Sequence, residues 1–265
     1  MFFRCGKLYD AGENSPRAEY MQTGSSFQLS TLDAHIWTIP TKTSDAVVGR
    51  LERILARDEI DRASRFRFGY LRDSFVIARG FLRCLLGQYL NLDPASICFS
   101  YGDKGKPVLC SGSTLQFSLT HSNGIAAIAL TSGCQIGVDL EHVRRMNDMQ
   151  QIADRYFCSE EAAEIMSLSS EERARAFFCC WTRKEAYIKA IGDGLSCPLD
   201  SFRVTVRPNA DARLIHIGGN RATAKMWTLQ DLNLATGYAA AVAYRDRHRS
   251  LSIFPMTAAS ELLNL

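Results

Sequence analysis

Two carboxylates lying two residues apart are the first candidates for chemistry in this sequence. Segment 135–141 alternates polar or small residues with apolar ones, which predicts a strand with Asp139 and Glu141 on one face. Their Cα atoms would lie ~6.6 Å apart, so their oxygens can converge on one ion, and oxygen ligands suit Mg²⁺. Gly137 on the same face leaves room for a ligand to approach. The alternative is a strand edge whose polar face lies in water.

A third carboxylate lies in segment 177–195, which reads as one helix and its end. Glu185 and Lys189 are one turn apart, and Gly192 and Gly194 follow with the conformational freedom that a helix end requires. One interpretation is an i,i+4 ion pair of ~0.3 kcal/mol on a solvated face. The other is a metal-binding carboxylate followed by a phosphate-binding ammonium. Helical spacing predicts one shared side for Phe177, Trp181, Lys184, Glu185, Ile188 and Lys189.

Weaker signals come earlier in the chain. His121 follows a predicted buried strand and has a hydroxyl residue on each side, so it is either a structural histidine or part of an anion-binding turn. Lys106 lies in a Gly-Lys-Pro turn, where most lysines face solvent. Arg62, Arg65 and Arg67 stud a short helical segment, which is either a solvated face or a phosphate site.

Composition narrows the class of protein. The 265 residues are 46% hydrophobic and 22% charged, as in an ordinary globular protein, and no apolar run approaches the ~20 residues of a membrane span. The net charge of +3 does not indicate a nucleic-acid binder, but it suits a polyanionic small ligand or an acidic partner. The N-terminal apolar run is too short for a signal peptide, so we expect a cytoplasmic protein.

The pattern of cysteines predicts reduced thiols. The nine cysteines are odd in number and form no Cys-x-x-Cys, and several, including Cys84, Cys98, Cys179 and Cys180, lie in apolar runs. This pattern is typical of buried reduced thiols and not of a disulfide framework or a zinc site.

The expected elements repeat along the chain. We expect helices over 44–55, 58–68, 72–90, 154–168 (capped at Ser159) and 171–191. We expect strands over 31–39, 97–101, 115–120, 125–130, 134–141, 202–206, 224–229 and 238–244, with a hairpin turn at 121–124. A long helix followed by three strands therefore occurs twice, and the endings 124–130 and 237–244 are alike.

This repetition predicts an α+β fold, a pseudo-dimer of two similar subdomains that each pack a long helix on a small antiparallel sheet. We expect a flexible N-terminal leader (1–30), an N-terminal subdomain (31–134), a C-terminal subdomain with the acidic motifs (135–250) and a tail (251–265). A site built from both halves would lie in the cleft between them.

Each of these motifs is weak alone, but their order and spacing along the chain are specific for one family of proteins. Gly-Lys-Pro at 105–107, Phe-Ser-Leu-Thr-His-Ser at 117–122, Gly-Val-Asp-Leu-Glu at 137–141 and the motif 181–195 together closely resemble the 4′-phosphopantetheinyl transferases of the surfactin-synthetase-activating type. The resemblance covers roughly residues 45–206. It implies the pseudo-dimeric fold of that family, a monomer, and Mg²⁺-dependent transfer of the phosphopantetheine arm of coenzyme A to a carrier-protein serine, with release of 3′,5′-ADP.

The same resemblance implies roles for individual residues. Asp139 and Glu185 match the ligands that hold Mg²⁺ on the pyrophosphate, and Glu141 matches the third acidic position. Glu185 also matches the proposed general base for the carrier serine, and Lys189 matches the lysine on the pyrophosphate, so the catalytic set is Asp139, Glu185 and Lys189. The residues that the resemblance places against coenzyme A are Arg62, Arg65, Tyr101, Lys104, Gly105, Lys106, Pro107, Thr120, His121 and Lys189.

The family usually has Asn-x-Ser-His where this chain has Ser118-Leu119-Thr120-His121. Thr120 keeps the hydroxyl, while the loss of the asparagine alters local bracing. The resemblance implies a carrier domain that is acidic around the modified serine. The basic residues near the motifs that could steer it are Arg144, Arg145, Arg155, Arg183 and Lys184. Ordinary solubilising surface is the alternative for these residues.

Two other functions remain open at this level. A non-catalytic binder of coenzyme A or of a carrier protein, with the same fold, would bind coenzyme A without consuming it. A different Mg²⁺-dependent phosphotransferase or pyrophosphatase would release phosphate or pyrophosphate. The filled acidic and basic positions argue against the first, and the motif 181–195 argues against the second.

Overall fold

The computed structural model describes residues 28–102, 104–110, 112–245 and 249–255. Its helices are α1 (Asp45–Arg53), α2 (Arg57–Ala63), α3 (Gly69–Leu90), α4 (Met149–Tyr156), α5 (Ser159–Ser167), α6 (Ser170–Ile191) and α7 (Arg221–Ala224). Its strands are β1 (Asp33–Pro40), β2 (Phe99–Tyr101), β3 (Pro107–Leu109), β4 (Leu115–Ser122), β5 (Ile125–Ser132), β6 (Ile136–His142), β7 (Phe202–Val204), β8 (Leu214–Ile217), β9 (Thr228–Asp231), β10 (Tyr238–Tyr244) and β11 (Ser250–Pro255). Most of the leader predicted over 1–30 lies outside the described residues.

The two halves have the same topology. The N-terminal sheet contains β1-β5-β4 in that order, the C-terminal sheet contains β6-β10-β9, and the neighbours within each triplet pair antiparallel. A 22-residue helix and a two-stranded hairpin come between the first strand and the last two in both halves, namely α3 with β2–β3 and α6 with β7–β8. The predicted α+β pseudo-dimer is thus confirmed.

A buried carboxylate repeats at the same place in each half. Glu59 in α2 and Glu161 in α5 each accept a hydrogen bond from the backbone amide that precedes their own short helix. Each also pairs with a basic side chain of the long helix, Arg83 at 2.6 Å and Lys184 at 2.8 Å. Arg83 and Lys184 both lie fourteen residues after the start of their helices (69 to 83, 170 to 184). The duplication therefore extends to individual polar contacts.

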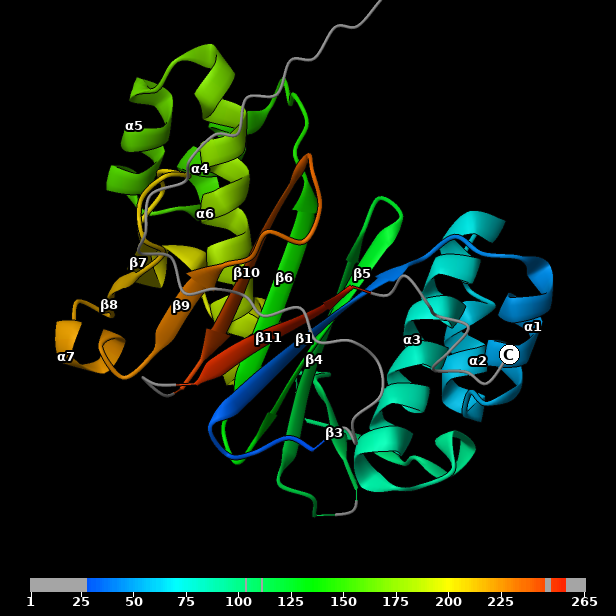
Figure 1. Ribbon diagram of the computed structural model, residues 1–265. Coiled ribbons are helices and arrows are strands. Elements are labelled where there is room, and N and C mark those ends of the chain that lie inside the picture. The colour runs from blue at the N-terminus through cyan, green and yellow to red at the C-terminus, as the bar shows by residue number, and fades with distance from the viewer. Residues whose placement is uncertain (1–27, 103, 111, 246–248, 256–265) are drawn as a thin grey trace, which may run out of the picture.

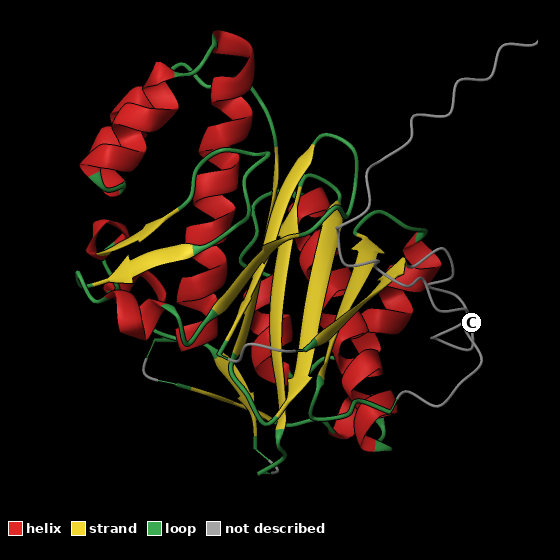
Figure 2. Ribbon diagram, turned by 60° about the vertical axis from the view of Figure 1, so that its left-hand side comes forward, coloured by secondary structure: helices red, strands yellow, loops and turns green. Residues whose placement is uncertain are grey.

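Figures 1 and 2 show the layers of helices and sheets, and three apolar cores hold these layers together. One lies between the N-terminal sheet and α1–α3, and one between the C-terminal sheet and α4–α6. The third lies between the two sheets and includes small side chains such as Ala127, Ala129 and Ala240, which allow close approach of the strands. The apolar face of β6 enters this central core, and the carboxylates lie on the opposite face, as the alternation predicted.

The ends of several elements differ from the sequence-based expectation. His121 and Ser122 belong to β4, and the turn that follows is the pair Asn123-Gly124, both with positive φ. The helix cap predicted at Ser159 is at Cys158 instead. Residues 221–224, which overlap the strand expected over 224–229, form α7, and the strand there is β9.

Other short strands escaped prediction altogether. The strands β3 and β8 are three and four residues long, so they carry too little alternation to be recognised. Residues 251–255 of the predicted tail belong to β11, which pairs parallel with β1 and so returns the chain to the N-terminal sheet.

Among the described residues, no helix is both long and apolar enough to cross a membrane.

Candidate active site

Close contact between β6 and α6 places the acidic residues. A Cβ atom added to Gly137 would lie 2.1 Å from the Ala186 carbonyl oxygen and 2.3 Å from the Ala190 amide nitrogen. The space beside Gly137 is therefore filled by the backbone of α6, and the expectation that it admits a ligand was wrong. This approach sets Glu185 and Lys189 of α6 against the polar face of β6.

Asp139 is the centre of the polar contacts. Its Oδ1 atom accepts hydrogen bonds from Lys189 Nζ at 2.6 Å and from Thr120 Oγ1 at 2.9 Å. Its Oδ2 atom is buried and has no hydrogen-bond partner. The ammonium of Lys189 thus pairs with a strand carboxylate, whereas the sequence also allowed an i,i+4 pair with Glu185 on a solvated face.

A row of hydroxyls joins the two halves where β4 runs beside β6, a line that we call the seam. Ser118 Oγ accepts from the Val138 amide at 3.1 Å, Thr120 donates to the carboxylate just described, and Ser122 Oγ donates to Glu141 Oε2 at 2.8 Å. The three hydroxyls recur at every second residue and so face the same way. The bracing that the sequence put in doubt at Ser118 is present as a hydroxyl contact to the backbone.

The carboxylates share a cavity of about 360 Å³, lined by Leu119, Thr120, His121, Asp139, Glu141, Trp181, Glu185 and Lys189. Burial raises the pKa of Glu185, and the nearby charge of Asp139 raises it further. Burial also raises the pKa of Glu141, which the hydrogen bond from Ser122 partly offsets. More carboxylates than ammonium groups line this cavity, and their mutual repulsion contributes to the raised pKa of Glu185.

This cavity fits a cation by its chemistry. Three acidic side chains face it, and one buried oxygen of Asp139 has no hydrogen-bond partner. An all-oxygen set of this kind suits Mg²⁺, which keeps several waters and takes phosphate oxygens as further ligands. Within the described part of the chain, no three His, Cys, Asp or Glu side chains are already drawn together as a metal cluster. Because Lys189 already pairs with Asp139, a bound cation would have to share that carboxylate with it.

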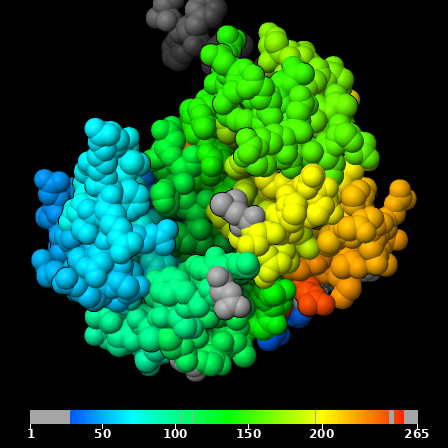
Figure 3. Space-filling view, turned by 180° about the vertical axis from the view of Figure 1, so that it is seen from behind, coloured from blue at the N-terminus to red at the C-terminus, as the bar shows by residue number. Residues whose placement is uncertain are grey.

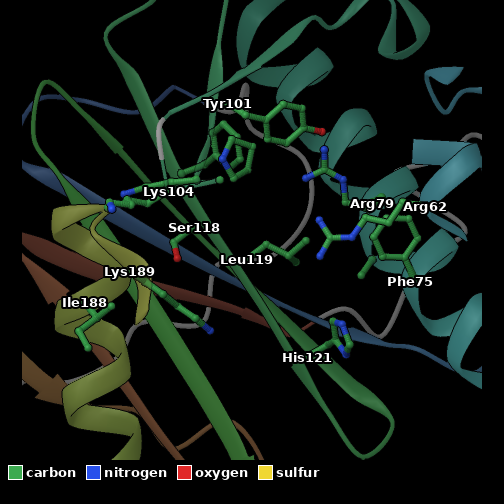
Figure 4. A pocket seen from close by; sticks show the side chains of 17 residues that line it. Arg62, Phe75, Arg79, Tyr101, Lys104, Ser118, Leu119, His121, Ile188 and Lys189 are labelled. Carbon is green, nitrogen blue, oxygen red and sulfur yellow. The ribbon is translucent and has the colours of Figure 1, made fainter. Parts of the chain in front are cut away.

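A second cavity of about 360 Å³ adjoins the first, since Leu119, His121 and Lys189 line both. Seen from behind, the molecule is hollowed between the N-terminal helices and the C-terminal half (Figure 3). Figure 4 shows basic side chains reaching into the pocket from both halves. The predicted coenzyme A residues that line it are Arg62, Tyr101, Lys104, Gly105, Lys106, Pro107, His121 and Lys189.

The other two predicted residues lie close by. Arg65 lines an adjoining hollow of about 590 Å³, which shares Arg62 and Tyr101 with the basic cavity. Thr120 lines the acidic cavity. The structure therefore brings every predicted site residue to one of three adjoining cavities.

Sequence reasoning missed Arg79, which points into the basic cavity beside Arg62 (Figure 4). Its guanidinium lies 2.6 Å from Glu59 Oε1, and Arg83 contacts the other oxygen of the same carboxylate. One carboxylate thus faces two guanidinium groups, so this wall keeps a positive charge. Two arginines within the apolar stretch 75–87 of α3 were the signal that could have revealed it.

Two basic groups of this cavity have lowered pKa values, which favour their neutral forms. Burial lowers the pKa of Lys106 to about 8, while its Nζ donates to the carbonyls of Ile136 and Ala190. Burial also lowers the pKa of His121, with the charges of Lys189 and Arg62 acting in the same direction. A bound anion would raise both pKa values, because it favours the charged forms.

Two of the residues predicted to steer a carrier protein are not on the surface. Arg183 and Lys184 are fully buried, where Arg183 pairs with Asp231 and Lys184 with Glu161. Lys184 accordingly does not share the accessible side of α6 with Glu185, contrary to the prediction. Arg144, Arg145 and Arg155 are exposed.

Comparison with known proteins identifies the family to which this chain belongs. The model of the 4′-phosphopantetheinyl transferase superfamily matches residues 135–243. The 4′-phosphopantetheinyl transferase HetI from Nostoc sp. is 37% identical over 214 residues, covering 80% of this chain and 87% of that protein. The 4′-phosphopantetheinyl transferase Sfp from Bacillus subtilis is 28% identical, covering 62% of this chain and 77% of that protein.

This chain belongs to the 4′-phosphopantetheinyl transferase superfamily. Among solved structures, the holo-acyl-carrier-protein synthase of Thermotoga maritima overlaps 43% of this chain and 64% of its own, with 18% identity and a TM-score of 0.34. The family assignment rests on the sequence matches and not on this overlap.

Proposed function

We propose that this protein transfers the 4′-phosphopantetheine arm of coenzyme A to a serine of an acyl or peptidyl carrier protein and releases 3′,5′-ADP. The observation that carries the proposal is the junction at the seam. There an acidic cavity suited to a cation and a basic cavity suited to a nucleotide share Leu119, His121 and Lys189 as walls. A pyrophosphate lies between a nucleotide and its transferable arm, so its place would be at this junction.

The basic cavity is proposed to hold the 3′,5′-ADP part of coenzyme A. Lys104 lines one side, and Arg62 and Arg79 line another (Figure 4), while Lys106 from the same hairpin turn as Lys104 also lines the cavity. His121 and the adjoining Arg65 add capacity for the 3′-phosphate. Arginine suits this task because its fork of donors binds phosphate at two points.

For this reaction the protein must mainly position the carrier serine against the pyrophosphate and neutralise the negative charge of the phosphates. The serine oxygen of the carrier forms a bond to the phosphorus nearest the pantetheine, the bond from that phosphorus to the bridging oxygen breaks, and 3′,5′-ADP leaves with the electron pair. The Glu185 carboxylate takes the serine proton, directly or through a water. Lys189 neutralises charge on the pyrophosphate.

We infer that Mg²⁺ is the cation, held by Asp139 and Glu185 with Glu141 as the third acidic side chain. The partnerless Oδ2 of Asp139 supports this choice. When bound, Mg²⁺ would neutralise the pyrophosphate oxygens and favour departure of the leaving group.

Further features of the proposal rest on the surface and the duplication. The exposed Arg144 and Arg145 begin three residues after Glu141, where they can attract an acidic carrier domain. Two halves joined in one chain supply both cavities, which supports a monomer of the surfactin-synthetase-activating type. Buried thiols such as Cys179 and Cys180 support a cytoplasmic location.

The test is product analysis by liquid chromatography. The protein is incubated with coenzyme A, Mg²⁺ and a panel of apo carrier proteins, and the nucleotides released are identified. The proposal expects 3′,5′-ADP in amounts equal to the carrier modified. Release of phosphate or pyrophosphate would indicate another phosphotransferase or pyrophosphatase. Binding of coenzyme A with no product on any carrier would indicate a non-catalytic binder.

A further inference from the structure

The hairpin β2–β3 forms one wall of the basic cavity through the turn between its strands. Tyr101 at the end of β2 donates from its hydroxyl to Asp58 Oδ2 at 2.8 Å, which ties the hairpin to α2. Lys106 at the other end of the turn donates to the Ile136 and Ala190 carbonyls of the C-terminal half. The turn is thus held on both sides of the cavity, while the strands themselves are only three residues long.

Two cysteines lie opposite each other at the open end of this hairpin. Cys98 directly precedes β2 and Cys110 directly follows β3, and the ladder pairs Phe99 with Leu109. The Cys110 amide donates to the Cys98 carbonyl at 3.0 Å, which continues the ladder by one pair. Opposite residues of such a ladder lie ~4.5–5.5 Å apart at Cα, within the ~4.4–6.8 Å that disulfides span.

The side chains of this pair are also in contact. The two Sγ atoms are 2.7 Å apart, and both residues are exposed. The other described cysteines are buried or partly buried, for example Cys84, Cys180 and Cys197. The sequence placed Cys98 among the buried thiols, and the structure corrects this, because the hairpin projects its open end into solvent.

We propose that Cys98 and Cys110 are a modification site, a dithiol that closes to a reversible disulfide when a low-molecular-weight disulfide such as oxidised glutathione is present. One thiolate attacks the small disulfide and releases one small thiol, and the second cysteine then displaces the other small thiol from the mixed disulfide. The two protein thiols lose two electrons and two protons, and the small disulfide gains both as two thiols. A dithiol reductant reverses the reaction.

The disulfide would act on the cavity through the hairpin. A two-stranded hairpin is marginally stable by itself, and a cross-link at its open end removes unfolded conformations of the eleven residues that it encloses, 99–109. The turn is then held more firmly in the conformation that lines the basic cavity. On the proposed function, oxidation should lower the KM for coenzyme A about threefold, because less ordering is required on binding.

Thiol mapping tests the site without reference to activity. The full-length protein is treated with oxidised glutathione, alkylated with iodoacetamide, digested and analysed by mass spectrometry. We expect one linked peptide pair that joins Cys98 to Cys110, and dithiothreitol should restore two alkylatable thiols. Cys197→Ser is the matched control and should leave the link intact. Cys98→Ser should abolish it and leave Cys110 as a glutathione adduct.

Alkylation of both Cys98 and Cys110 after oxidation would overturn the site, as would separate glutathione adducts on both or a link to another cysteine. The KM for coenzyme A is then compared between oxidised and reduced protein, with Cys98→Ser as the variant that should show no difference. A linked peptide with an unchanged KM would overturn the effect on the cavity. A linked peptide in a protein that releases no 3′,5′-ADP would instead count against the proposed function alone.

Discussion

The Nζ atom of Lys189 lies 2.6 Å from Oδ1 of Asp139, so a lysine of the long helix is paired with a strand carboxylate that is almost fully buried. The second oxygen of that carboxylate is buried without a hydrogen-bond partner. Asp139 is therefore held in place through one oxygen, while the other oxygen has an unused capacity to accept. This is the arrangement expected of a ligand that is positioned by the protein before a cation arrives.

Asp139→Asn tests that position with little change of shape. The amide oxygen can still accept from Thr120 and Lys189, so the fold should survive, but the charge that attracts a cation is lost. We expect the transfer rate to fall by about 10²-fold or more. Initial rates on an apo carrier protein, with thermal unfolding as the check on folding, measure this.

Asp211→Asn is the matched control, because Asp211 pairs with Arg213 on the exposed surface. It should leave the rate unchanged. Turnover of Asp139→Asn within a few-fold of the parent protein would remove Asp139 from the proposed cation site.

A double-mutant cycle tests the ion pair itself. Lys189→Met leaves the carboxylate of Asp139 buried without its charged partner, so the single variant should be less stable. Combined with Asp139→Asn, the loss should be smaller than the sum of the two single losses, with a coupling free energy of about 1–3 kcal/mol. Urea unfolding of the four proteins gives this value. Additive free energies would show that the contact does not contribute to stability.

The pKa of Lys106 predicts a pH dependence of nucleotide binding. Burial lowers this pKa to about 8, so the ammonium loses its proton as the pH rises through that value and its attraction for phosphate is lost. His121 contributes little to this change, because its pKa is lowered from an ordinary value that is already below 7. We expect the Kd for 3′,5′-ADP to rise at least about threefold between roughly pH 7 and pH 9.

Calorimetric titrations at both pH values measure this effect. Lys106→Met should bind more weakly near pH 7 and show a much smaller pH dependence. Lys104→Met is the control, since Lys104 is exposed and should leave the pH dependence in place. An unchanged pH dependence in Lys106→Met would assign the effect to another group.

Gly137→Ala tests the contact of α6 with β6. The new methyl group would overlap the helix backbone at 2.1 Å and 2.3 Å, and backbone atoms cannot rotate away. We expect a loss of stability of at least about 2 kcal/mol and a marked loss of activity, because the helix that carries Glu185 and Lys189 must shift. Gly49→Ala in α1 is the contrasting control. It has open space around it, so helix propensity predicts a gain of about 0.5–1 kcal/mol. Equal effects of the two substitutions would contradict the close contact.

The sequence was most informative where its pattern is long and regular. The alternation around Asp139 and the period of the long helix around Glu185 predicted two elements, and both face the same cavity. The duplication was recognisable because each copy keeps its long helix and its closing strand. The resemblance to a known family then selected one chemistry from several that the residue types allowed.

Prediction failed where long-range contacts decide the outcome. Lys184 has the spacing of an accessible residue, yet the carboxylate of Glu161 from another helix draws it into the core. The sequence around Gly137 predicts space for a ligand, because no local signal shows that the backbone of α6 fills that space. The position of Arg79 in the cavity depends on how α3 packs, which the sequence does not show. The exposure of Cys98 depends on a hairpin whose strands are too short to be recognised from the sequence.

Intact-mass spectrometry of apo carrier proteins incubated with this protein, coenzyme A and Mg²⁺ tests the central claim most directly. We predict that at least one carrier gains the mass of one phosphopantetheine, that EDTA abolishes the gain, and that added Mg²⁺ restores it. A carrier panel that stays unmodified while coenzyme A binds to the protein would contradict the transferase. Modification that proceeds unchanged in EDTA would contradict the cation site at Asp139.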